Sequence, residues 1–170
     1  MVFEPIVGLY AGHLVSETSK SIFNKIWDVL NETRHSTLEI NTELDIESKV
    51  KLIESIIRDI NEEIKMHNLI PTKSLELALL QMKDIIDRIH LNFVEIRVGI
   101  QYYESLWFKS FRTAGYLEHI ELLKKNNIIL DSRLDNLVKI IMLFKNTIKK
   151  DTTNTNTTNT TKNDDTYLTS

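Results

Sequence analysis

The chain has 170 residues, of which 42% are hydrophobic and 26% are charged, a composition typical of one soluble globular domain. Four glycines and two prolines are too few for a turn-rich β-sandwich or β-barrel. Because cysteine is absent, a disulfide framework, a zinc finger, an iron–sulfur site and a thiol nucleophile are excluded. The net charge of −3 does not indicate a nucleic-acid partner.

The two ends of the chain differ in composition from its middle. The first twenty residues lack the basic region and the long apolar run of a secretory signal, so we expect an intracellular, cytoplasmic protein. Residues 151–170 are rich in Thr and Asn, and almost no apolar side chains are present to offset the entropy of ordering them. We therefore expect a folded domain over residues 1–150, with a charge near −1, followed by a disordered tail over residues 151–170.

The first expected helix covers roughly residues 5–33. Its clearest part repeats apolar side chains at helical spacing, with Phe23 and Trp27 beside them as a pair four residues apart. Its front part contains Gly8 and Gly12 and is apolar on several sides, so we expect it to be only marginally helical. The repeating residues are Val15, Ile22, Ile26 and Leu30.

The second expected helix begins after Asp45, a candidate N-cap, and ends near Asn68, because Pro71 disfavours helical backbone at the residue before it. Its apolar residues alternate in steps of four and three, which places them on one face. They are Ile46, Val50, Ile53, Ile57, Ile60 and Ile64.

The third expected helix is unusually long, from Lys73 to about Phe111, with Thr72 as its candidate cap. The same four–three alternation continues along it, and only Gly99 interrupts it, at a cost of about 1 kcal/mol. Its apolar stripe consists of Leu75, Leu79, Met82, Ile86, Ile89, Phe93, Ile96, Ile100, Tyr103 and Trp107.

The C-terminal region predicts helix over residues 115–126 and again over residues 131–150. Its apolar residues again step by four and three, and they are Leu130, Leu134, Leu137, Ile141, Phe144 and Ile148. The pair Asn126 and Asn127 indicates a break or a kink, and Asp131 is a candidate cap, so one bent helix and two helices both remain open. Together the elements predict an all-α, up-and-down bundle of four or five helices with a long third helix. The heptad spacing also permits coiled-coil self-association.

Motifs for catalysis and metal binding are missing. The five histidines form no HExxH motif, and the only acid–histidine pairs at helical spacing are Asp87 with His90 and Glu63 with His67. Neither matches the Glu-x-x-His motifs of a di-iron bundle, and no glycine-rich phosphate loop or nucleophile elbow occurs. We expect no metal, no cofactor and no enzymatic activity.

Two surface features admit a functional and a structural interpretation. The lysine pairs Lys124–Lys125 and Lys149–Lys150 lie near expected helix ends, where they either stabilise the helix dipole or attract anionic lipid. The aromatic cluster between Tyr102 and Phe111 is either a base-stacking or membrane-interface belt or, as we favour, the aromatic end of the core.

A family resemblance adds to this interpretation. The run from Glu4 to Leu14, EPIVGLYAGHL, resembles the start of fungal HeLo domains, which also open with an acid–proline pair and an apolar segment of small residues. The wider layout is similar to the N-terminal bundle of mixed lineage kinase domain-like proteins and to coiled-coil domains of the powdery-mildew-resistance type. In those, as here, an aromatic–basic stretch such as the one from Trp107 to Arg112 precedes the final helix.

The resemblance implies a non-enzymatic cell-death or immune-signalling module that oligomerises and attacks membranes through its first helix and basic surfaces. The candidate partners are other proteins, further copies of the chain and an anionic membrane surface. The near-neutral charge departs from the basic face expected of membrane-active members and favours an adaptor role. A scaffolding bundle without membrane activity is the alternative. The candidate membrane-contact residues are Ile6, Val7, Leu9, Tyr10 and Leu14.

Overall fold

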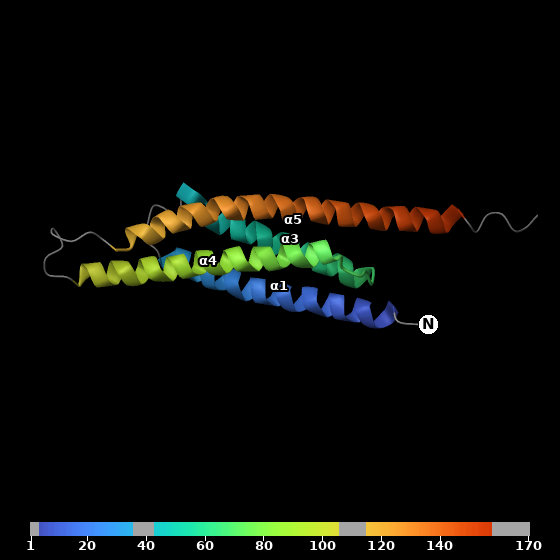
Figure 1. The fold of residues 1–170 in the computed structure, drawn as a ribbon, viewed down its shortest axis with the longest axis horizontal. Helices are drawn as coiled ribbons and strands as arrows, with labels where there is room; N and C mark the ends of the chain where they lie inside the picture. The colour runs from blue at the N-terminus through green and yellow to red at the C-terminus, as the bar shows by residue number, and fades with distance from the viewer. Residues whose placement is uncertain (1–3, 36–42, 106–114, 158–170) are drawn as a thin grey trace, which may run out of the picture.

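The computed structural model describes the backbone of residues 4–35, 43–105 and 115–157, and the side chains of residues 13–33, 43–105 and 115–146. Long helices account for almost all of this part of the chain. They are α1 (Glu4–His35), α3 (Ile46–Met66), α4 (Lys73–Glu104) and α5 (Leu117–Thr157). The helices run alternately in opposite directions along one axis, and the described residues contain no strand (Figure 1). The expected all-α, up-and-down bundle is confirmed.

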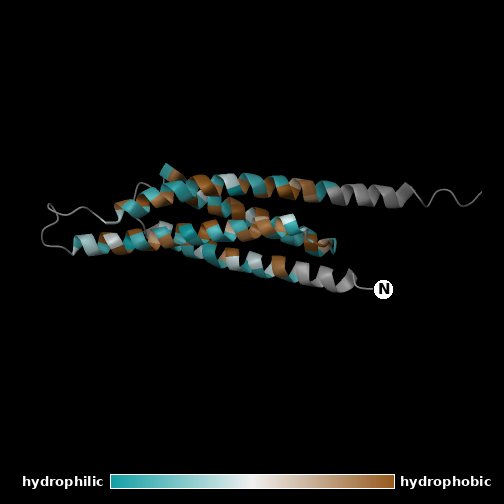
Figure 2. Cartoon of the chain, viewed as in Figure 1, coloured by the Kyte–Doolittle hydropathy of each residue, from teal (hydrophilic) through white to brown (hydrophobic). Residues whose placement is uncertain are grey.

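The helices differ in how closely they pack. α4 lies between α1 and α5 and packs along both, α1 also packs against α3, and α3 approaches α5 at only a few points. Hydrophobic and hydrophilic residues alternate along each helix (Figure 2). The buried residues of each helix repeat at helical spacing, so one apolar stripe of each is buried. The most completely buried side chains come from the predicted stripes and include Ile22, Ile26, Ile53, Ile57, Leu79, Met82, Ile86, Leu130 and Leu137.

Backbone geometry explains both ends of α3. Asp45 occupies the expected N-cap position, but it adopts a left-handed conformation with φ of 50° and its side chain makes no capping hydrogen bond. At the other end Asn68 is also left-handed, with φ of 48°. The Leu69 amide donates to the Ile64 carbonyl at 2.9 Å and the Asn68 amide to the Lys65 carbonyl at 3.4 Å. This is the Schellman arrangement that ends a helix.

The start of α4 confirms one expected cap. Thr72 has extended backbone, and its hydroxyl oxygen accepts a hydrogen bond from the Leu75 amide at 3.3 Å. The helix ends at Glu104 rather than near Phe111, where the apolar repeat had placed its end. Residues 106–114, which include most of the aromatic cluster, lie outside the described residues.

α5 is one continuous helix, which decides in favour of one helix between the two alternatives that Asn126 and Asn127 left open. Asn127 is buried within it and accepts a hydrogen bond from the Lys49 ammonium at 3.1 Å, while Leu123 and Leu130 on either side are fully buried. This burial outweighs the modest helix penalty of two asparagines. Asp131 is therefore an interior helical residue and caps nothing.

α5 continues past Lys150 to Thr157, so the first seven residues of the expected tail have helical backbone. Residues 158–170 lie outside the described part of the chain.

A glycine sets how closely α4 and α5 approach. A Cβ atom added at Gly99 would lie 2.6 Å from the Cβ of Tyr116, closer than two carbons can approach. Beside this contact the rings of Tyr103 and Tyr116 meet edge to face, with centroids 6.2 Å apart. The glycine that interrupts the helical pattern is thus required by packing rather than by backbone conformation.

Gly99→Ala is expected to destabilise the bundle by about 1–3 kcal/mol, because the added methyl group forces α5 away from α4. Alanine at an unconstrained helical position would instead stabilise it by about 1 kcal/mol. Gly115→Ala is the matched control, since nothing lies within 4 Å of an added Cβ there. Urea unfolding followed by circular dichroism measures both, and equal stability of the two variants would contradict the close approach.

Candidate functional site

The residues expected to contact a membrane all belong to α1. Ile6, Val7, Leu9 and Tyr10 lie in its first two turns, and their side chains are outside the described residues. Leu14 is described, and its side chain is 42% exposed. The structure therefore supports an accessible apolar group at only one of the five positions.

The expected basic residues all lie on α5, and the helix does not bring them together. Lys124 forms an ion pair with Glu121 at 3.6 Å, and Lys125 is exposed. Because α5 is continuous, both are interior residues and not near a helix end, so the dipole interpretation does not apply to them. Lys149 and Lys150 follow after roughly 36 Å of helix, and their side chains are outside the described residues.

The acids of the two acid–histidine pairs bind lysines instead. Asp87 pairs with Lys83 at 2.9 Å, and Glu63 pairs with Lys145 at 2.5 Å. Among the described side chains no group of three or more His, Asp or Glu is placed to hold a metal ion.

Two ion pairs join α3 to α5. The Lys49 ammonium lies 2.7 Å from a carboxylate oxygen of Asp131, and the Lys145 ammonium lies 2.5 Å from one of Glu63. On each helix the two partners are fourteen residues apart, which is two heptads and nearly the same helical face. Since the charges are reversed between the two ends, they specify a parallel pairing in one register.

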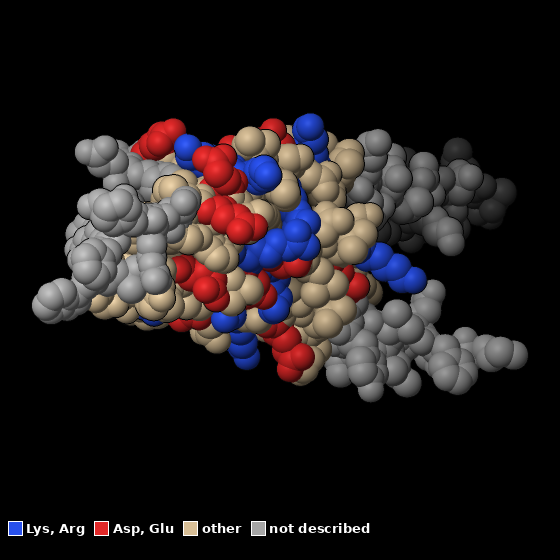
Figure 3. Space-filling view, turned by 60° about the vertical axis from the view of Figure 1, so that its left-hand side comes forward, with Lys and Arg blue, Asp and Glu red and all other residues tan. Residues whose placement is uncertain are grey.

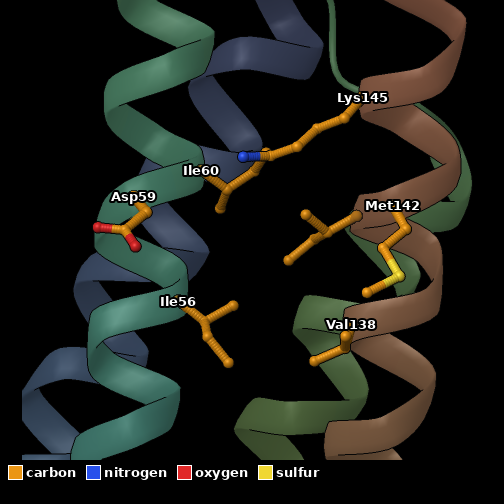
Figure 4. A pocket seen from close by; sticks show the side chains of 7 residues that line it. Ile56, Asp59, Ile60, Val138, Met142 and Lys145 are labelled. Carbon is orange, nitrogen blue, oxygen red and sulfur yellow. The ribbon is translucent and has the colours of Figure 1, made fainter.

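An apolar groove of about 340 Å³ opens between these ion pairs, where α3 and α5 separate (Figure 4). Ile60 and Ile141 are buried at its floor, and Ile56 and Val138 line its walls half-buried. Met142 also lines it and is 59% exposed.

Two charged residues also line the groove, and they lie differently. The Lys145 side chain extends from α5 across the opening toward α3, whereas the Asp59 carboxylate points away from it (Figure 4). A pocket that is mainly apolar with a few polar groups at its edge is the usual form of a binding site.

Sequence analysis did not identify this groove, although one signal for it was present. Lys49, Ile56 and Glu63 repeat at intervals of seven, and so do Asp131, Val138 and Lys145, with opposite charges at corresponding positions. Such complementary heptads indicate which two helices pair and in what register. They do not indicate that the helices separate between the ion pairs.

A second charged cluster joins α4 to α5. The Arg133 guanidinium donates to a carboxylate oxygen of Asp84 at 2.9 Å and to the backbone carbonyl of Gln81, and Arg88 lies 3.0 Å from the same Asp84 oxygen. The hydrogen bond from Arg133 is the main cause that holds the pKa of Asp84 below its ordinary value, and the charge of Arg88 adds to it.

Arg133→Gln is expected to reduce the unfolding free energy at pH 7 by less than about 1 kcal/mol, since the Asp84 side chain is half exposed. Because folding lowers the pKa of Asp84, the pair contributes its full stability above the unfolded pKa of about 4 and loses it as pH falls through the folded pKa. The difference in unfolding free energy between the variant and the wild type should therefore become smaller below pH 4. Urea unfolding at pH 7, 4 and 2.5 measures it, and an equal gap at all three would show that Asp84 is not involved.

Apolar side chains also cover the outward face of α4. Between 44% and 61% of each of these side chains is exposed. They are Leu77, Leu80, Leu91, Val98 and Tyr102. On the face seen in Figure 3 acidic and basic side chains are interspersed, with no region of a single sign.

Comparison with known proteins adds one relative. The chain is 27% identical over 157 residues to an uncharacterized protein of Acanthamoeba polyphaga mimivirus, which covers 78% of this chain and 76% of the relative. No protein-family model matches the sequence, and no solved structure matches it. Within the described residues no helix is long and apolar enough to cross a membrane.

Proposed function

We propose that this protein is a non-enzymatic helical bundle that acts in the cytoplasm as a signalling or adaptor module by associating with further copies of itself. The outward face of α4 is the observation that carries the proposal. A bundle helix ordinarily buries one apolar stripe and exposes a polar one. α4 carries a buried stripe against α1 and α5 and a second apolar set on the opposite side.

The second set follows helical periodicity. At about 100° per residue, its five members fall within roughly 60° of one another. Their separations of three, eleven, seven and four residues are sums of the three- and four-residue steps along which helices pack. We call the surface formed by these five residues the α4 face. Its regular spacing distinguishes it from single exposed apolar residues, which occur on most proteins.

Charged residues divide the α4 face into three apolar parts. Asp84 and Arg88 lie between Leu80 and Leu91, and the exposed Glu95 lies between Leu91 and Val98, on the same side of the helix. The face therefore contains both an acid and a base, and two copies can place opposite charges together as well as apolar groups. Such pairs contribute more to the specificity of an interface than to its affinity.

The apolar area sets the expected strength of association. Burial of a half-exposed Leu or Val contributes about 1 kcal/mol, which gives roughly 10 kcal/mol for the two faces of a dimer. Association costs about 4–15 kcal/mol in lost freedom of motion. The balance predicts a weak contact, with a dissociation constant that is roughly micromolar or weaker and a mass that depends on concentration.

Leu91→Lys combined with Val98→Lys is expected to keep the chain monomeric at concentrations where the wild type associates, because the face then presents two further charges. Sedimentation velocity over roughly a hundredfold range of concentration measures the mass. Met66→Lys is the matched control, since Met66 is 74% exposed on α3 and away from the α4 face. A wild type that is monomeric throughout, or a double variant that associates as the wild type does, would contradict the proposal.

Membrane contact through α1 is the second mode that the family resemblance implies, and the exposure of Leu14 favours it. Ile6→Asp is expected to abolish dye release from liposomes that contain anionic phospholipid, because a charge at this position opposes insertion, while helical content stays near wild type. Dye release by both the wild type and the variant, or by neither, would contradict membrane contact through α1. The alternative function, a scaffold without membrane activity, would then be favoured, and the proposed self-association would not be affected.

A further inference from the structure

We infer that the α3–α5 groove of one copy receives the Trp27-bearing edge of α1 from a second copy. We call Lys20, Phe23 and Trp27 the Trp27 edge. The inference rests on the proposed self-association, but it adds a contact that is separate from the α4 face. In this contact the groove is occupied by the Trp27 edge, whose central side chain is aromatic.

The Trp27 edge has the composition of an interface anchor. The Trp27 side chain is 59% exposed, and Phe23 lies one turn before it, half-buried against the core. Tryptophan at the centre of an interface is among the residues that contribute most to binding. Lys20 is exposed two turns before Trp27 on the same side of α1 and has no ion pair with a described side chain.

The groove offers complementary chemistry. Its floor and walls are aliphatic, and its volume of about 340 Å³ lies within the range of pockets that enclose a bound group. Asp59 borders it on α3 and has no ion-pair partner among the described side chains. Lys20 follows Ser19, which contacts Asn61 of the antiparallel α3, so Lys20 is about level with Asp59 along the bundle axis. The lysines that close the two ends of the groove are already paired, so Asp59 is the acid beside it that matches Lys20.

The relative positions of the Trp27 edge and the groove along the bundle axis determine the kind of assembly that the contact forms. The Ser19 hydroxyl donates to the Asn61 side-chain oxygen at 3.3 Å, which aligns the antiparallel helices α1 and α3 at this level. Trp27, eight residues after Ser19, is therefore level with Ile53, within roughly 5–10 Å of the groove residues Ile56–Ile60 along the axis.

The two surfaces lie on different flanks of α3. α1 contacts α3 at Asn61 and α5 contacts it at Lys49 and Glu63, positions roughly 120–160° apart around the helix, so α3 separates the Trp27 edge from the groove of its own chain. Repetition of the contact rotates each copy about the bundle axis. Such a head-to-tail contact builds a ring if the rotation closes without net translation and an open helical assembly if it does not.

Cross-linking tests the inference directly, because the chain has no cysteine. Asn24→Cys lies one turn before Trp27, and Lys139→Cys lies one turn before Met142; both native residues are exposed. The two variants, one of them carrying a mass tag, are mixed and treated with a flexible bis-maleimide. The experiment is run with the native α4 face and again with Leu91→Lys and Val98→Lys, so that failure of the α4 contact is distinguished from failure of this one.

We expect the mixture to give at least tenfold more cross-linked dimer than either variant gives alone. It should exceed to the same extent the yield from Asn24→Cys mixed with Glu95→Cys on the α4 side. Both results are expected with the native α4 face and with the substituted one. Trp27→Ser and Met142→Lys should each reduce the yield at least tenfold, whereas Met66→Lys should not. Both substituted side chains are more than half exposed, and thermal melts check that folding is retained. Equal yields from all pairs, yields insensitive to Trp27→Ser, or product only with the native α4 face would overturn the inference.

Discussion

The burial of α4 between α1 and α5 is the contact on which the rest of the structure depends. Its inward stripe is apolar over almost its whole length, and most of these side chains are fully buried. The close approach at Gly99 draws α5 onto α4, while α3 is held mainly by α1. α3 and α5 are therefore neighbours that are not pressed together, and the groove between them follows from how tightly α4 is packed.

Polar contacts set the register of the helices that apolar burial brings together. Arg133 connects α5 to Asp84 and to a carbonyl of α4, and the ion pairs of Lys49 and Lys145 align α3 with α5. Pairs at the surface contribute little net stability, but a wrong register would leave the half-buried Lys49 without its partners Asp131 and Asn127. The charges thus select one arrangement among several that the aliphatic stripes would tolerate.

The surfaces that remain accessible point to association as the property that links fold to function. The α4 face, the groove and the Trp27 edge are each larger or more regular than isolated exposed apolar residues. The groove is aliphatic with Asp59 beside it, and the Trp27 edge carries an exposed aromatic side chain and Lys20. The association that we propose through these surfaces and through the α4 face would make assembly depend on concentration.

The four–three apolar repeat in the sequence determined the helical class and the buried stripes of the four helices, because such a repeat has only one face to bury. The Thr72 cap was predicted from the type of this residue and its place before the third helix. The repeat left open what depends on contacts between helices. Asn126 and Asn127 were compatible with a break or a kink, and the helix continues through them because Lys49 of another helix binds Asn127 and buried leucines flank it. The apolar repeat also did not predict the groove or the outward exposure of the α4 face, because a repeat along the sequence does not specify which helices become neighbours or how closely they pack. The tertiary structure decided these features through the packing of α4 against α1 and α5.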